Sequence, residues 1–182
     1  MKNIAVCDTC ALIQLRKGVK VTGDFYSNRN EKTVMNTLKQ DYEQDFYVWI
    51  QHNIALLKQG KFNEIDIDIL IDELESMAKR DRRELTSRLM ILIAHLLKWQ
   101  FQPVKKSGSW QCAIDEQRIQ IIEQLEESPS LKNILPESIG KAYSKAVTLA
   151  AKETGLPIEI FPKKCPYLIE QLLDDDFYPL SE

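Results

Sequence analysis

Residues 63–103 read NEIDIDILIDELESMAKRDRRELTSRLMILIAHLLKWQFQP, with no glycine and no proline before Pro103. Asp66 or Asn63 can cap the start of a helix, and Pro103 ends the helical pattern. One uninterrupted helix would be about 50 Å long at a rise of 1.5 Å per residue. Alternatively, the helix breaks within AKRDRRE, which is almost wholly charged. In either case this part of the chain is helical.

The second half of this segment places its leucines on one face. At about 100° per residue, one narrow sector of the helix contains Leu85, Leu89, Leu92, Leu96 and Trp99. This spacing predicts a buried seam. A second stripe lies beside the seam and contains Glu84, Arg88, His95 and Gln102. These four side chains are expected at the rim of the buried face.

Further helices are expected on both sides of this segment. Apolar spacing predicts one helix over residues 41–60, one that follows Ser109 as its N-cap, one that ends at Gly155, and a short one that begins at Pro166. No stretch from Asp41 onward alternates polar and apolar residues as a strand would. The sequence therefore predicts an all-α fold, a single multi-helix bundle with one or two long helices. A helical domain over residues 41–182 follows an N-terminal extension, residues 1–40, of uncertain structure.

Composition is that of a soluble globular protein. The 182 residues are 44% hydrophobic and 28% charged, with a net charge of -3, which gives no overall attraction to nucleic acid. The longest apolar runs are about half the length that a membrane span needs, and no secretion signal is recognisable. The 4 cysteines do not form a disulfide framework. A cytoplasmic protein without a membrane partner is expected.

An ordered series of landmarks gives a family resemblance. The stretches YEQDFYVW, LIDELESM, SRLMILIAHLLKWQFQP, SPSL, AYSKAVTLAAKETGL and CPYLIEQLLDDDFYP resemble, in sequence and in order, the bacterial domain of unknown function family 29. The resemblance covers approximately residues 41–179. It implies a compact all-helical domain from bacteria, in a group where cyanobacteria are prominent. It implies no activity, since none is assigned to the family.

The first residues resemble a different kind of domain. NIAVCDTCALIQLRKG looks like the opening of a PIN-type nuclease domain, in which Asp8 would be the first metal ligand. Such a domain needs further carboxylates over about a hundred residues of alternating strand and helix, yet the helical family begins at Asp41. A fortuitous match or a remnant is favoured over a live nuclease. Residues 1–40 are therefore expected to be dispensable for folding.

The CDTC stretch has the spacing of zinc and redox motifs. Zinc needs a second pair of ligands, but Cys112, Cys165, His52 and His95 are isolated in the sequence. A redox motif needs a βαβ setting, which the helical pattern does not supply. We expect no metal and no cofactor.

Positive charge and aromatic rings meet between residues 95 and 118. Lys98, Lys105, Lys106 and Arg118 with Trp99 and Trp110 form a mixture that single-stranded nucleic acid binding uses. The candidate functional patch is His95, Lys98, Gln102, Lys105, Lys106, Trp110 and Arg118. The structural alternative is that a neutral His95, disfavoured as a cation by Arg88 and Lys98, makes one hydrogen bond at a helix rim.

No Gly-rich phosphate loop, nucleophile elbow or paired Cys–His motif is present in the sequence. This favours a non-enzymatic interaction module whose partner is another protein or a copy of itself. Aromatic residues in DFYVWIQH and in the FYP tail, beyond what a core would bury, support that hypothesis. The alternative is a nucleic-acid-acting protein, such as a toxin–antitoxin component, which the Lys/Trp/Arg patch and the PIN-like opening would favour.

Overall fold

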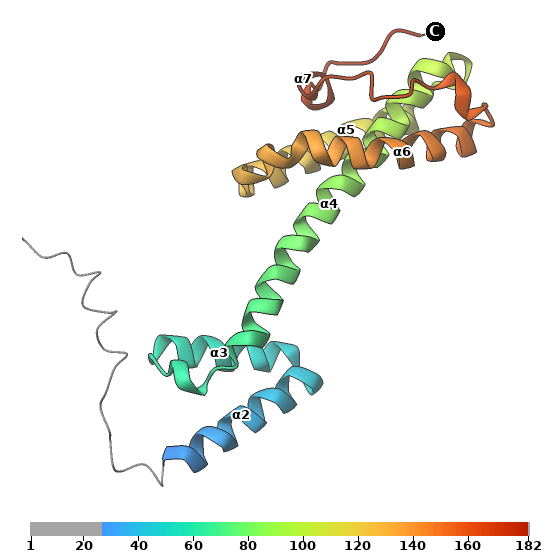
Figure 1. Cartoon of the computed structure of the whole chain (residues 1–182). Helices are drawn as coiled ribbons and strands as arrows, with labels where there is room; N and C mark the ends of the chain where they lie inside the picture. The colour runs from blue at the N-terminus through green and yellow to red at the C-terminus, as the bar shows by residue number, and fades with distance from the viewer. Residues whose placement is uncertain (1–26, 182) are drawn as a thin grey trace, which may run out of the picture. The chain divides into compact units, whose positions relative to one another are not determined.

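The computed structural model of the chain describes residues 27–181, and side chains from residue 36 onward. Six α-helices follow one another along these residues (Figure 1): α2 Ser27–Gln44, α3 Phe46–Lys58, α4 Ile67–Phe101, α5 Gly108–Glu127, α6 Leu135–Thr154 and α7 Ile169–Leu173. Residues 27–181 contain no strand, so the all-α prediction is confirmed. They divide into two compact units, unit 1 up to Ile71 and unit 2 from Asp72.

The long segment forms a single helix, which decides between the two alternatives that the sequence allows. Asp66 caps α4, because its Oδ1 accepts a hydrogen bond from the backbone N–H of Ile69 at 3.3 Å. Side chains one turn apart pair along the charged stretch, with Lys79 Nζ 2.9 Å from Glu75 Oε2. Such pairs stabilise an exposed helix by a few tenths of a kcal/mol each. The AKRDRRE stretch is therefore a solvated helical surface.

The prediction of a single helix over residues 41–60 is wrong, because the helix is interrupted at Asp45. This residue leaves the helical conformation at φ -149°, and its Oδ1 accepts a hydrogen bond from Val48 N–H at 3.1 Å. An N-cap inside an apolar pattern thus ends α2 and starts α3. His52 Nδ1 on α3 lies 2.8 Å from Asp41 Oδ2 on α2.

Unit 1 has a small core at the contact of α2, α3 and the start of α4. Among residues 36–71, whose side chains the structure describes, its buried hydrophobic residues are Leu38, Trp49, Leu56 and Ile65. Leu38 is 2% exposed and lies on α2, three residues before Asp41. The boundary expected at residue 41 therefore falls within α2, next to a residue of this core.

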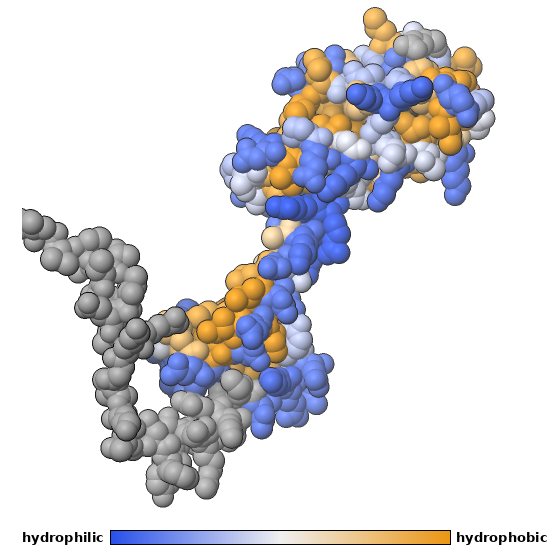
Figure 2. Space-filling model, in the orientation of Figure 1, coloured by the Kyte–Doolittle hydropathy of each residue, from blue (hydrophilic) through white to orange (hydrophobic). Residues whose placement is uncertain are grey.

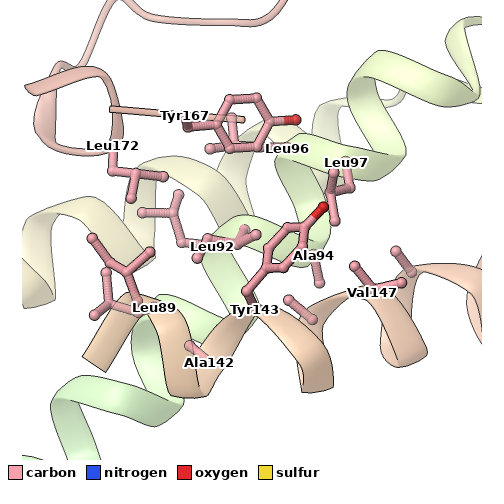
Figure 3. Packing of buried hydrophobic residues seen from close by; sticks show 14 of the residues in the cluster. Leu89, Leu92, Ala94, Leu96, Leu97, Ala142, Tyr143, Val147, Tyr167 and Leu172 are labelled. Atoms are coloured by element: carbon pink, nitrogen blue, oxygen red, sulfur yellow. The ribbon is translucent and has the colours of Figure 1, made fainter. Parts of the chain in front are cut away.

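Unit 2 has the larger core, where the second half of α4 packs against α5, α6 and the C-terminal segment. The predicted seam is buried, since Leu85, Leu89, Leu92 and Leu96 are all 0% exposed. Figure 3 shows Leu89, Leu92 and Leu96 together with Ala142, Tyr143 and Val147 of α6 and, from the C-terminal segment, Tyr167 and Leu172. The small residues of α6 permit close approach of the two helices.

The ends of the unit 2 helices follow local signals in most places. Gly155 adopts φ 75° directly after α6, a left-handed conformation in which glycine carries no steric penalty. Ser109, expected as the N-cap of α5, lies one residue inside the helix, and Ser107 is the N-cap. The hydroxyl oxygens of the two serines are 2.9 Å apart. The helix expected near Pro166 is α7, which begins three residues later.

Candidate functional site

The charge of Lys98 lies against other side chains of unit 2. Its side chain belongs to a residue only 4% exposed, and its Nζ lies 2.5 Å from Glu153 Oε2 on α6. The same Nζ lies 4.4 Å from the centre of the Trp110 ring. The charge and the ring that the sequence suggested for nucleic acid are therefore engaged with each other and with α6.

Four other groups of unit 2 form a row of cations and rings. Lys106 Nζ lies 4.8 Å from the Trp99 ring centre, and the Trp99 and Tyr178 rings are 4.9 Å apart. Arg118 lies 5.4 Å from the Tyr178 ring centre and closes the row. Lys106 Nζ also donates to Ser181 Oγ at 2.8 Å. The row joins the C-terminal segment to the rest of unit 2, and each of the two rings has a cation over one face.

Arg118 is the centre of this attachment. The residue is 0% exposed, and its guanidinium donates to three backbone carbonyls, of Leu172 at 3.2 Å, Asp175 at 3.1 Å and Phe177 at 2.5 Å. Burial lowers the pKa of Arg118 from its ordinary value, while Tyr178 and the carboxylates of Asp115, Asp175 and Asp174 oppose that shift. Arg118 is therefore a structural anchor for the segment that follows α7.

Tyr178 shares this environment. Its hydroxyl donates to Asp115 Oδ1 at 2.6 Å. Burial, and then the Asp115 carboxylate, raise the pKa of Tyr178 to about 12, so the phenol stays protonated. The aromatic pair of the FYP tail is thus packed on the unit 2 core, with Phe177 and Tyr178 partly buried. The tail does not supply the surplus aromatic surface that the sequence suggested.

His95 and Gln102 have structural contacts. His95 Nδ1 lies 3.0 Å from the carbonyl of Ile91, one turn back on α4, and Gln102 Nε2 donates to the carbonyl of Thr154 at 3.2 Å. Burial is the main cause that lowers the pKa of His95, and the Lys98 charge adds to it. The neutral imidazole expected from the sequence is favoured, chiefly by desolvation rather than by cationic neighbours.

The stability of the protein is expected to depend on pH through His95. Because the pKa of His95 is lowered from 6.5 in the folded state, the unfolded state binds the proton more readily as pH falls. This contribution to stability is present above the unfolded pKa and is lost below it, toward the lower folded pKa. Urea unfolding of His95→Gln should show a smaller loss of stability than wild type between about pH 7 and about pH 5. Equal losses would contradict a buried, neutral His95.

The seven candidate residues therefore do not form one open patch. Of them, only Lys105 is exposed, Lys98 and Arg118 are buried, and the other four are partly buried. Most of their polar groups bind other parts of unit 2. Arg118 was missed as an anchor because its partners are backbone carbonyls, which leave no mark in the sequence.

The most unusual exposed surface lies on α3. Phe46 and Tyr47 are 46% and 70% exposed, so the first two aromatic residues of FYVWIQH do lie outside the core. Ile54, Leu57 and the nearby Phe62 are also exposed. We call these five residues the α3 face. Figure 2 shows hydrophobic side chains gathered over α3 and the first turns of α4.

The composition of α3 differs from that of an ordinary surface helix. Its 13 residues, FYVWIQHNIALLK, include one lysine, Lys58, and no carboxylate. A helix that is hydrophobic on most sides is normally buried. Exposed apolar surface of this kind marks an interaction site more often than a solvated face.

No group of three or more potential metal ligands is present between residues 36 and 181. Cys7, Cys10 and Asp8, on which the zinc and nuclease interpretations depend, lie outside the described residues. Within the part of the chain that the structure describes, no helix is long and apolar enough to cross a membrane.

A family model, described as "Domain of unknown function DUF29", matches residues 42–178. The chain belongs to DUF29. The DUF29 match begins in α2 and ends at Tyr178, so it includes the α3 face as well as the Arg118 anchor. No curated protein and no solved structure is significantly similar to the chain. The family confirms the resemblance seen in the sequence and assigns no activity.

Proposed function

We propose that this DUF29 chain is a cytoplasmic, non-enzymatic interaction module that pairs with a second copy of itself through the α3 face. The observation that carries the proposal is the contrast within unit 1. Between residues 36 and 71, four hydrophobic residues are buried in its core, whereas the α3 face exposes five large ones. Exposed apolar surface of this extent on a helix is typical of a surface that a partner covers.

A second copy suits this surface for an electrostatic reason. The α3 face carries no acidic side chain and α3 has only Lys58, at its last position, so two copies can meet without like-charge repulsion. Symmetric dimers with the same patch on both chains are the commonest soluble oligomers. Interfaces of this kind are more apolar than those of transient complexes.

Leu57→Glu is expected to abolish this pairing, because it would place a charge without a partner in the apolar interface. Sedimentation equilibrium should give twice the chain mass for wild type at about 100 μM, a concentration at which a micromolar dimer is saturated. The variant should give the mass of one chain. Leu57 is 42% exposed, so the monomer is expected to remain folded.

The matched control is Ile119→Glu. Ile119 is 53% exposed on α5, outside the α3 face, and the same substitution there should leave the dimer intact. A wild-type protein with the mass of one chain at this concentration would refute self-pairing. So would equal dissociation in the two variants.

Nucleic-acid action has less support. The tryptophan rings that would stack on bases already contact lysines, Trp99 with Lys106 and Trp110 with Lys98. Base stacking needs a free ring face. A toxin–antitoxin role would also depend on residues 1–26, which lie outside the described part of the chain.

A further inference from the structure

A groove of about 740 Å³ lies between α4 and α6 in unit 2. Four basic side chains line it, Arg82 and Arg83 from α4 and Lys141 and Lys145 from α6. The hydroxyl groups of Ser87 and Ser144 lie among them. The groove is separate from the α3 face, which belongs to unit 1.

The charge of the groove is little neutralised from within the chain. Lys141 Nζ lies 2.5 Å from Glu137 Oε1, one turn back on α6. Between residues 36 and 181, Arg82, Arg83 and Lys145 form no ion pair, because no carboxylate oxygen lies within 4.0 Å of their charged nitrogens. Lys141, and then Arg82, lower the pKa of Glu137, so this acid stays ionised.

This concentration of positive charge is unusual for the chain. The whole sequence has a net charge of -3, whereas, within the described part of the chain, four cations and no carboxylate line the groove, and Lys141 alone of these cations is ion-paired, with Glu137. Clefts lined by one sign of charge attract ligands of the opposite sign. Because the cations come from two helices, a ligand between them can contact both rows.

We propose that the groove binds a small polyphosphate anion, free or carried by an organic molecule. Arginine guanidinium groups bind phosphate oxygens through two parallel hydrogen bonds, and lysines add point charges. Serine hydroxyls can donate further hydrogen bonds to the same oxygens. Met90 contributes an apolar surface for a small organic part.

The lining favours a small ligand over single-stranded nucleic acid. None of the residues that line the groove is aromatic, so bases would have no ring on which to stack. Stacking supplies much of the affinity of single-strand binders. The groove therefore offers charged and hydroxyl groups for phosphate, but no ring for a base.

The test is isothermal titration calorimetry of the full chain with inorganic tripolyphosphate at low salt. Wild type is expected to bind at one saturable site. The double variant Arg83→Gln/Lys145→Gln should weaken binding at least about 100-fold, since each charge-assisted contact contributes roughly tenfold or more. Arg83→Lys, which keeps the charge but loses the two-pronged geometry, should show an intermediate loss. All substituted side chains are exposed, and circular dichroism checks that the variants remain folded.

The matched control is Lys152→Gln, which removes an exposed lysine of α6 that does not line the groove. It should bind tripolyphosphate within about twofold of wild type, as expected for a distant, screened charge. Equal weakening by Lys152→Gln, or no saturable binding by wild type, would overturn the proposal. Tighter binding of a single-stranded RNA oligonucleotide, with the same sensitivity to the double variant, would overturn the assignment to a small ligand.

Discussion

Replacing Arg118 by methionine is expected to lower the free energy of unfolding by about 3–5 kcal/mol, the range seen when one partner of a buried charged network is removed. Methionine fills much of the same space but donates no hydrogen bond. The carbonyls of Leu172, Asp175 and Phe177 would lose their donor, and those that stay buried would lack a partner. Urea unfolding followed by circular dichroism measures the loss.

Two variants show whether this loss comes from the hydrogen bonds. Arg118→Lys keeps the charge but cannot reach three carbonyls, so it should lose part of the stability. Arg80→Met removes an exposed arginine of α4 and should change stability by no more than about 0.5 kcal/mol. A loss of less than about 1 kcal/mol in Arg118→Met would contradict the role of an anchor.

Trp49→Ala is expected to have the second large effect, a loss of about 3–5 kcal/mol confined to unit 1. Trp49 is 2% exposed, and its ring lies 5.2 Å from that of Tyr42 and 5.3 Å from that of Phe46. It is also the largest of the four hydrophobic residues that are buried between residues 36 and 71. Its truncation leaves a large cavity at the contact of α2 and α3, so these two helices should unfold.

Amide-resolved NMR spectra can localise this effect. The signals of α5 and α6 should keep their dispersion, while those of α2 and α3 should collapse toward the values of an unfolded chain. Tyr47→Ala is the control on the same helix, since that ring is 70% exposed and contributes little to the core. Loss of the unit 2 signals in Trp49→Ala would show that the two units do not fold separately.

Much of the fold could be predicted from the sequence because its signals are local. The leucines of α4 recur at helical spacing, and the predicted seam is buried from Leu85 to Leu96. Gly155 ends α6 in the left-handed conformation, which depends on the backbone of this one residue and not on distant contacts. The break at Asp45 was not predicted, because helical spacing of apolar residues continues across it. The N-cap hydrogen bond at the break joins residues only three apart. In the sequence, however, an aspartate that caps a helix cannot be distinguished from an aspartate on the exposed side of a continuous helix.

The sites depend on contacts between distant residues, which explains why the sequence located them poorly. The basic residues near Trp99 are adjacent in the chain, but the fold turns Lys98 toward Glu153, 55 residues away. The groove takes Arg82 and Lys145 from separate helices, and no single stretch of sequence contains both. In contrast, the α3 face lies on one helix except for Phe62, which follows α3 closely in the sequence. Its excess of aromatic residues could therefore be recognised from FYVWIQH alone.

The Arg118 anchor has a consequence for the order in which unit 2 folds during synthesis. The carbonyls that satisfy this guanidinium belong to residues 54 to 59 positions later in the chain, so a ribosome releases them after α5 and α6. Until then the Arg118 guanidinium is hydrated, and the side of the core that Leu172 covers is exposed to solvent. Helices that could associate early are thereby held in an incomplete state. When the C-terminal segment docks, it removes water from the Arg118 guanidinium and covers the core at the same time. Docking of this segment is therefore the step that completes the packing of unit 2.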